Sequence, residues 1–278
     1  MPDTRDTVFT LSGFGDEISS DLDQQLDALR GMGIQHLELR GVWGKNVVDL
    51  TDTEVNRVKR ALADRGMSVS AIGSPIGKVP VGAPLEPHLE DLRRVLEIAH
   101  HLDTQLVRVF SFYVKPGEHE RQRPEVLGRM EALVRLCEGS GVTLAHENEK
   151  EIYGDTPERC ADILRHVDSP SLRAVFDPAN FVQVGVARPF DRAWPLLGDY
   201  VLYAHIKDAL LDSGQVVPAG RGDGQVPSLL QALKDRGRPC FLSLEPHLVF
   251  AGSTQGFSGE ALFRQAAEAL LSLIARLD

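Results

Sequence analysis

The sequence predicts an α/β protein in which residues 1–278 form one domain, a single-domain (β/α)8 TIM barrel. Two observations predict this fold. Short apolar segments alternate with amphipathic helical patterns along the chain, and eight apolar segments begin 27 to 40 residues apart, as in successive βα units that feed one parallel sheet. No segment rich in Pro or Ser and no block of like charges interrupts this spacing, so we place no domain boundary. A doubly wound parallel sheet is the alternative, because a sequence pattern cannot show that a sheet closes.

The predicted strands are short runs of apolar and β-branched residues. In chain order, the first strand covers 7–12, the second begins at 34, the third begins at 68 and the fourth covers 105–110. The fifth begins at 142, the sixth covers 172–177, the seventh covers 200–206 and the eighth begins at 240. Amphipathic helical patterns separate the strands, most clearly at 86–101, 124–138, 156–166 and 260–276.

Two kinds of signal mark the ends of the helices. In the segments 26–39, 61–72, 134–149 and 230–245, a helical pattern stops at a glycine that can adopt a left-handed conformation, and a strand follows. At the start of the helix 156–166, Thr156 can cap the helix, Pro157 suits its first position and Glu158 places an acid in its first turn. The glycines of GRGDG, at 220–224, indicate only a flexible loop.

Composition and charge exclude several classes of protein. With 42% hydrophobic and 25% charged residues, the chain can bury a sizeable core. Its net charge of −10 would repel phosphate backbones, so we expect no nucleic-acid partner. Its three cysteines form no CxxC pair, which argues against a disulfide scaffold or a thiolate zinc site.

We find no signal-peptide pattern and no apolar run near the roughly 18 residues of a membrane span, so we expect a cytoplasmic protein without a membrane partner. A homo-oligomer is left open.

Four side chains suited to metal binding stand at consecutive predicted strand ends, where the active site of a TIM barrel lies. Glu147 ends the fifth strand, Asp177 ends the sixth, His205 lies on the seventh and Glu245 ends the eighth. Alone, each has a common structural explanation as a helix cap, an ion-pair partner or a packed histidine. Together they predict a site for one divalent ion. Carboxylates and an imidazole without a thiolate favour Mn²⁺ or Mg²⁺, with Co²⁺ or Zn²⁺ as alternatives.

Other residues predicted near the same end of the barrel are candidates for substrate binding. Lys207 points to the same side of its strand as His205 and so can meet a substrate oxygen, the alternative being an ion pair. The further candidates are Glu38 and Arg40 at the end of the second strand, Arg108 on the fourth, Asn180 and His247 just after proposed ligands, and Trp43, which can cover the apolar face of a sugar. For the polar ones a structural hydrogen bond is the alternative, and for Trp43 a place in the core.

Four motifs carry a resemblance to a known family. HENE (146–149), FDPAN (176–180), HIKD (205–208) and LEPH (244–247) resemble, in order, spacing and strand-end position, the metal-binding motifs of the sugar phosphate isomerase/epimerase family of xylose isomerase-like TIM barrels. The resemblance spans nearly the whole chain. It implies that Glu147, Asp177, His205 and Glu245 bind the metal and that Glu147 and Glu245 are the catalytic acid/base pair.

The sequence departs from the ketose epimerases of that family at two positions. Those enzymes usually carry His three residues after the metal-binding Asp and Arg six residues after the metal-binding His, where this chain has Asn180 and Leu211. A ketohexose 3-epimerase is therefore not the favoured member of the family.

We expect a metal-dependent isomerase or epimerase that acts on a keto-sugar or sugar phosphate through a metal-stabilised enediolate. Loss of a β-hydroxyl would instead make it a dehydratase or lyase of a keto-inositol or 3-keto-glycoside. An endonuclease IV-like metal hydrolase, which the negative net charge disfavours, and a sugar-binding barrel without activity are further alternatives. The expected partner is a small carbohydrate.

Overall fold

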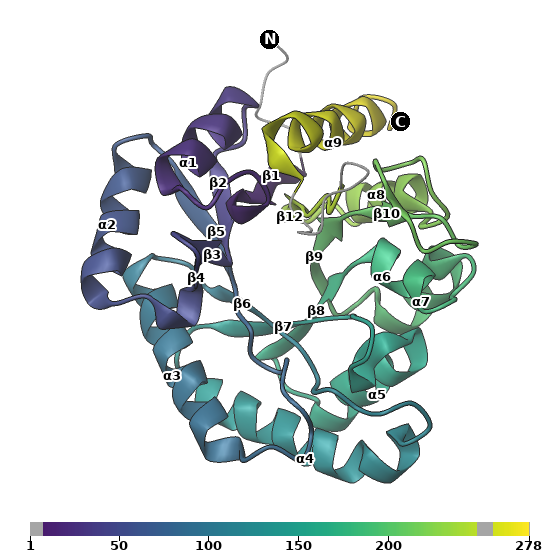
Figure 1. Ribbon diagram of the computed structural model, residues 1–278. Coiled ribbons are helices and arrows are strands. Elements are labelled where there is room, and N and C mark those ends of the chain that lie inside the picture. Colours follow the sequence, from purple (N-terminus) through teal and green to yellow (C-terminus); the bar gives the residue numbers. More distant parts are fainter. Residues whose placement is uncertain (1–7, 249–257, 278) are drawn as a thin grey trace.

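The computed structural model describes residues 8–248 and 258–277, and its main sheet is a closed barrel of parallel strands (Figure 1). In chain order these strands are β1 (Phe9–Phe14), β2 (His36–Leu39), β5 (Ser68–Gly73), β6 (Leu106–Val109), β7 (Thr143–Glu147), β8 (Leu172–Phe176), β9 (Val201–Ile206) and β12 (Cys240–Leu244). Gly13 of β1 is paired with Leu37 of β2 on one side and with Leu244 of β12 on the other, which closes the sheet. The predicted (β/α)8 barrel is confirmed, and the doubly wound alternative is wrong.

The helices form a ring outside the barrel (Figure 1). They are α1 (Leu22–Gly31), α2 (Asp52–Ala63), α3 (Leu85–His101), α4 (His119–Cys137), α5 (Pro157–Val167), α6 (Pro178–Gln183), α7 (Pro189–Leu197), α8 (Val226–Asp235) and α9 (Gly259–Ile274), with the short 3-10 helices η2 (Gly15–Glu17), η3 (Val47–Asp49) and η4 (Tyr153–Asp155). Among the residues described, we find no helix with the length and apolar character needed to cross a membrane.

The signals for helix ends are confirmed. Gly33, Gly66, Gly141 and Gly237, which follow α1, α2, α4 and α8, all have positive φ, between 64° and 77°. The Thr156 side chain accepts a hydrogen bond from the backbone of Arg159, and Pro157 is the first residue of α5. These local signals therefore mark the ends of four helices and the start of α5.

Several predicted boundaries differ from the structure by one or two residues, and the start of helix α4 differs most. Helix α4 begins at His119 rather than at 124, because Pro124 lies inside the helix and removes one backbone hydrogen bond without ending it. The first strand runs to Phe14, two residues beyond the predicted end. Residue 7, the predicted start of that strand, lies outside the described residues.

The loop at 220–224 is not the flexible segment that its glycines indicated. The buried carboxylate of Asp208 accepts backbone hydrogen bonds from Ala209, Gly220, Gly222 and Gly224 at 2.9 to 3.0 Å. A Cβ atom on Gly222 or Gly224 would lie 2.5 or 2.7 Å from Asp208 Oδ1, so the glycines allow a close approach to this carboxylate. We call Asp208 and these four N–H groups the Asp208 clasp.

Two small hairpins were not predicted. The first is β3 (Gly41–Val42) with β4 (Lys45–Asn46), and the second is β10 (Asp208–Ala209) with β11 (Val216–Val217). Both follow barrel strands, β2 and β9, and the second contains the start of the Asp208 clasp. They therefore shape the C-terminal end of the barrel.

An apolar layer fills the barrel below that end. Ala71, Ala145, Val175 and Tyr203 are at most 2% exposed and pack together. Because side chains alternate along a strand, Ala145 and Tyr203 point into the barrel on the same side as Glu147 and His205, two residues further along β7 and β9. This layer supports the polar residues above it.

Candidate metal centre

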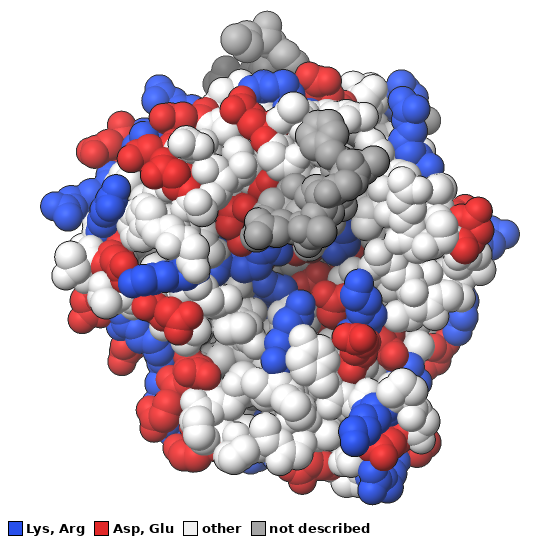
Figure 2. All heavy atoms as spheres, viewed as in Figure 1, with Lys and Arg blue, Asp and Glu red and all other residues white. Residues whose placement is uncertain are grey.

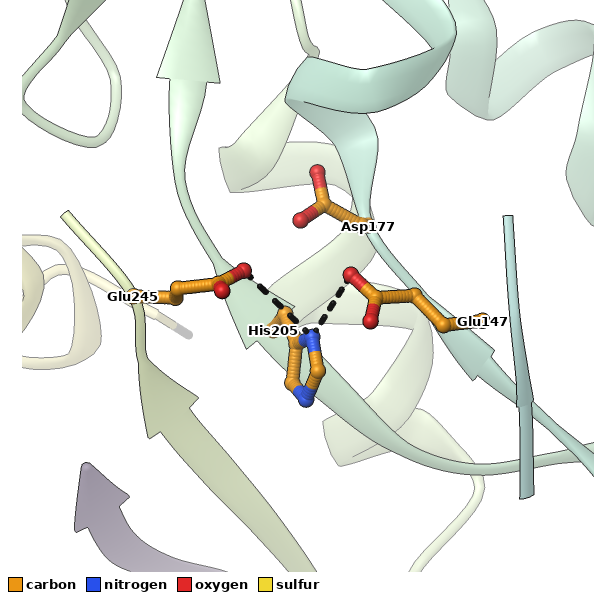
Figure 3. A group of neighbouring side chains, drawn as sticks. All are labelled: Glu147, Asp177, His205 and Glu245. Carbon is orange, nitrogen blue, oxygen red and sulfur yellow. Dashed lines mark ion pairs between the residues drawn. The ribbon is translucent and has the colours of Figure 1, made fainter. Parts of the chain in front are cut away.

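The structure brings the four predicted metal ligands to one place. Glu147 ends β7, Asp177 follows β8, His205 lies in β9 and Glu245 follows β12. One ligand atom from each residue lies within 4.8 Å of those of the others, and all four side chains are buried. Figure 3 shows the three carboxylates and the imidazole pointing toward one another from separate strand ends.

Asp177 uses its two oxygens differently. It caps α6, because Oδ1 accepts a hydrogen bond of 2.9 Å from the backbone N–H of Asn180. Oδ2 is buried and makes no hydrogen bond of suitable geometry, although Lys207 Nζ lies 3.0 Å away. Helix capping therefore fixes the carboxylate with one oxygen turned to the cluster.

The imidazole of His205 is oriented by carboxylates on both sides. Its Nε2 lies 3.2 Å from Glu38 Oε1, and this same oxygen accepts a hydrogen bond of 2.9 Å from the Tyr203 hydroxyl. Its Nδ1 lies 2.9 Å from Glu147 Oε1 and 3.8 Å from Glu245 Oε2 (Figure 3). With the Nε2 proton directed at Glu38, Nδ1 faces the carboxylates and can offer its lone pair to a cation once it has lost its own proton.

The acidic groups of the cluster draw positive charge to it. Burial lowers the pKa of His205, but Glu147 and Glu38 outweigh burial and raise this pKa to about 10. Burial raises the pKa of Asp177 to about 6, against the opposing effect of Lys207. The site therefore favours a cation beside Asp177 Oδ2 and His205 Nδ1.

The two glutamates are held in their ionised form. Burial acts against ionisation of Glu147, but His205 and Arg108 hold its pKa at about 2. Burial likewise opposes ionisation of Glu245, but Lys207 and His247 hold its pKa well below the ordinary value. Both carboxylates are therefore available as ligands or bases at neutral pH.

The residues present fit a divalent cation. The donors are three carboxylates and one imidazole with no thiolate, a set that suits Mg²⁺ or Mn²⁺ and allows Zn²⁺. Asp177 Oδ2 and His205 Nδ1 are buried and without a hydrogen bond, and both belong to the cluster. A bound cation would satisfy both atoms.

Most of the other predicted site residues contact this cluster. Arg108 Nη1 lies 2.9 Å from Glu147 Oε2, and Asn180 Nδ2 donates to Glu147 Oε1 at 3.2 Å. Lys207 Nζ is 3.0 Å from Glu245 Oε2. Three predicted residues therefore lie against the ligands.

Residues around Glu245 extend the cluster outward. Arg40 Nη1 and His247 Nε2 lie 2.6 and 2.9 Å from Glu245 Oε1. A cleft of about 710 Å³ adjoins them, and its lining includes Arg40, His247, Asp16, Glu17 and Asn46. This cleft offers room for a substrate beside Glu245.

Glu38 and Trp43, both predicted to bind substrate, contact other residues of the protein in the structure. Glu38 is fully buried behind His205, so it supports a ligand instead of facing the open end of the barrel. The Trp43 ring lies against the guanidinium of Arg57, 4.5 Å from its carbon, in the turn between β3 and β4. Among the described contacts of the four ligands, none involves Trp43.

The sequence analysis missed three residues that build the site. Asp16 Oδ2 and Glu17 Oε1 form ion pairs with Arg40 at 2.7 and 3.0 Å. Asn148 exchanges two hydrogen bonds with the backbone of Asp177. Asp16 and Glu17 lie just after β1, which runs to Phe14, whereas the predicted strand ended at 12. A prediction that placed the strand end at Phe14 would have included both residues among the strand-end candidates.

Comparison with known proteins gives one family. The family model described as xylose isomerase-like TIM barrel matches residues 26–273. An uncharacterized protein of Methanocaldococcus jannaschii is 24% identical over 164 residues. The chain spans about half the length of that curated relative, since the match covers 56% of either protein.

Solved structures with the same fold include proteins described as epimerase-like, as a probable dehydratase and as binding a zinc atom. The IOLI protein with a zinc atom has a TM-score of 0.77, 16% identity, and coverage of 97% of this chain and 99% of that one. A D-tagatose 3-epimerase-like protein has a TM-score of 0.75, 16% identity, and coverage of 96% and 97%. The probable 3-DHS dehydratase AsbF of Bacillus anthracis has a TM-score of 0.73, 18% identity, and coverage of 94% and 98%. At these identities the likeness establishes the fold.

Proposed function

Because the chain belongs to the xylose isomerase-like TIM barrel family, we propose that it is a divalent-metal-dependent isomerase or epimerase of a keto-sugar or sugar phosphate. Glu147, Asp177, His205 and Glu245 would hold the ion, Mn²⁺ or Mg²⁺ in first place. The substrate would be a small carbohydrate at the C-terminal end of the barrel.

The relative placement of Glu147 and Glu245 carries this proposal. Their strands, β7 and β12, are separated around the barrel by β8 and β9. The two carboxylates approach His205 Nδ1 from different directions (Figure 3). Each can therefore reach a different side of a substrate bound between them.

An ion held by these four residues would supply positive charge to stabilise a substrate carbonyl oxygen, which would make a proton on the neighbouring carbon easier to remove. One glutamate removes that proton, and the other returns a proton to the opposite face in an epimerisation or to the adjacent carbon in an isomerisation. Arg40 pairs with Glu245 Oε1 and Arg108 pairs with Glu147 Oε2, and these ion pairs orient both carboxylates. Lys207 lies where its ammonium can donate to a substrate oxygen.

A dehydratase or lyase acting on a keto-inositol or 3-keto-glycoside is the second candidate. Its specific support is His247, which is about one-third exposed and lies 2.9 Å from Glu245 Oε1. A histidine in this position can protonate a leaving β-hydroxyl after Glu245 has taken the proton from carbon. The similarity in fold to a probable 3-DHS dehydratase is consistent with this candidate.

A nuclease or a silent sugar-binding barrel is less favoured. On the face drawn in Figure 2, basic and acidic side chains are interspersed around the rim, and the net charge is −10. A duplex-binding surface would instead call for a continuous basic patch. Cleavage of an abasic-site oligonucleotide by the metal-loaded protein would support the nuclease over the isomerase.

The test is metal analysis followed by a screen for solvent deuterium uptake across ketoses, keto-inositols and 3-keto-glycosides. We expect about one equivalent of divalent ion per chain and deuterium at the carbon next to the carbonyl of one substrate class. His205→Ala should lose high-affinity metal binding, whereas His166→Ala, an exposed histidine paired with Glu131, should keep it. Full metal binding with no exchange into any of these compounds would favour the silent barrel.

A further inference from the structure

The cations around the site fall into two groups according to which carboxylate oxygen they contact. We call Glu147 Oε1, Asp177 Oδ2 and Glu245 Oε2 the inner oxygens, because each lies 2.9 to 3.8 Å from His205 Nδ1 or Lys207 Nζ. Arg108 contacts Glu147 at Oε2, and Arg40 contacts Glu245 at Oε1. Neither of these arginine contacts involves an inner oxygen.

Lys207 belongs to the other group. Its ammonium lies 3.0 Å from Asp177 Oδ2 and 3.0 Å from Glu245 Oε2, both of them inner oxygens. The inner oxygen of Glu147 accepts a hydrogen bond from the amide of Asn180 and lies 2.9 Å from His205 Nδ1, and no ion pair of Lys207 involves it. Lys207 thus places a fixed positive charge on two of the oxygens that a metal ion would use.

The surroundings of Lys207 keep the ammonium in this position. The residue is 6% exposed and follows the buried strand β9, whose His205 belongs to the same cluster. The next residue, Asp208, is anchored by the Asp208 clasp. The lysine therefore has little freedom to move its charge into solvent.

We infer that Lys207 competes with the divalent cation for Asp177 and Glu245 and thereby lowers the metal affinity of the site. This inference rests on the metal site of the proposed function. An ammonium and a divalent ion that share two oxygens repel each other strongly where water is excluded. The same ammonium neutralises both carboxylates when the ion dissociates, so the site can release its ion without leaving buried charges unpaired.

The test compares Lys207→Met and Lys207→Gln with the wild-type protein. Mn²⁺ affinity is measured by isothermal titration calorimetry and by competition with a chelating indicator. Thermal midpoints are measured in EDTA and in saturating Mn²⁺. We expect both variants to bind Mn²⁺ at least tenfold more tightly, to melt at a lower temperature than wild type in EDTA, and to gain more from Mn²⁺. If Lys207→Met folds only when Mn²⁺ is present, that dependence supports the inference. The Mn²⁺ affinity is then measured with Lys207→Gln.

Two matched variants separate charge from other effects. Lys207→Arg keeps the positive charge, so its affinity should stay at or below that of wild type. Lys78→Met removes a lysine that pairs with Glu149 at 3.2 Å and lies over the Phe110 ring, away from the four ligands, and its affinity should stay within about twofold.

The outcomes distinguish this inference from the proposed function. Unchanged or weaker Mn²⁺ binding by Lys207→Met and Lys207→Gln, with normal binding by wild type, would overturn the competition and leave the metal site in place. Absence of divalent-ion binding in wild type and both variants would overturn the metal site and the competition together.

Discussion

The buried carboxylate of Glu38 holds the imidazole of His205, with 3.2 Å between Oε1 and Nε2. Neither side chain is exposed to solvent. Glu38 belongs to β2 and His205 to β9, so the contact crosses the interior of the barrel. It holds Nε2 of the imidazole at Glu38 and leaves Nδ1 facing the cluster.

Replacing Glu38 by Gln should weaken metal binding without removing any ligand. The amide no longer offers a negatively charged acceptor to Nε2–H, and the loss of such a partner typically weakens metal binding about 10- to 100-fold. Calorimetric titration with Mn²⁺ measures the change. Tyr203→Phe is the control, because it removes only the hydroxyl that donates to Glu38, at 2.9 Å, and should have a smaller effect. Wild-type affinity in Glu38→Gln would show that Glu38 does not orient the ligand.

Replacing either proposed acid/base residue should reduce turnover even when metal is saturating. Glu147→Gln and Glu245→Gln should each lower kcat by at least about a hundredfold, the usual contribution of a general acid or base. Because the two carboxylates act on opposite sides, one variant should still exchange the carbon-bound hydrogen for solvent deuterium while forming no product. The control is Glu149→Gln, which removes a carboxylate paired with Lys78. Near-normal turnover in either variant would move the acid/base role to Lys207 or His247.

Removing the Asp208 carboxylate should destabilise the protein. In Asp208→Ala, four backbone N–H groups lose a charged acceptor. Since each unsatisfied buried group costs about 1–3 kcal/mol and such losses are not additive, we expect a decrease of roughly 3 kcal/mol or more in the free energy of unfolding. Urea denaturation measures it. Asp212→Ala, at an exposed position of the same hairpin, should change stability by less than about 0.5 kcal/mol. Equal effects of the two variants would contradict the role of the clasp.

His88 should contribute to loss of stability in mild acid. Its Nε2 accepts a hydrogen bond of 2.7 Å from the backbone N–H of Gly77, and burial lowers the pKa of His88 below its ordinary value. The unfolded chain then binds a proton more readily than the folded one, so stability falls as the pH drops below about 6.5. His88→Gln keeps an acceptor for Gly77 but cannot be protonated. The difference in free energy of unfolding between wild type and His88→Gln should shrink from pH 8 to pH 5.5, and a constant difference would contradict this.

The sequence predicted the cluster of proposed metal ligands because the signal of its residues is local. Glu147, Asp177 and Glu245 each end or follow a short apolar run, and a strand of a parallel barrel delivers its last side chain to the same end as its neighbours. Helix ends were predictable for a similar reason, since Gly33 and Gly66 need only a left-handed conformation at their own position.

The role of each remaining residue depends on a partner that is distant in the chain. Glu38 was a candidate for substrate binding, but its place behind His205 depends on packing across the barrel, 167 residues away. The clasp could not be predicted from its glycines, because what orders Gly220 and Gly224 is the carboxylate of Asp208, 12 and 16 residues earlier. Trp43 lies in a turn of a two-stranded hairpin that is too short to leave a periodic pattern.

The apolar layer of Ala71, Ala145, Val175 and Tyr203 has a kinetic consequence. Because this layer lies beneath the proposed ligands, we expect ion, substrate and water to reach the described site from the C-terminal end of the barrel. A substrate bound above the ligands would then obstruct the path by which the ion dissociates. Inactivation by a chelator should accordingly slow as substrate saturates the site, as in an ordered exchange in which the ion enters first and leaves last.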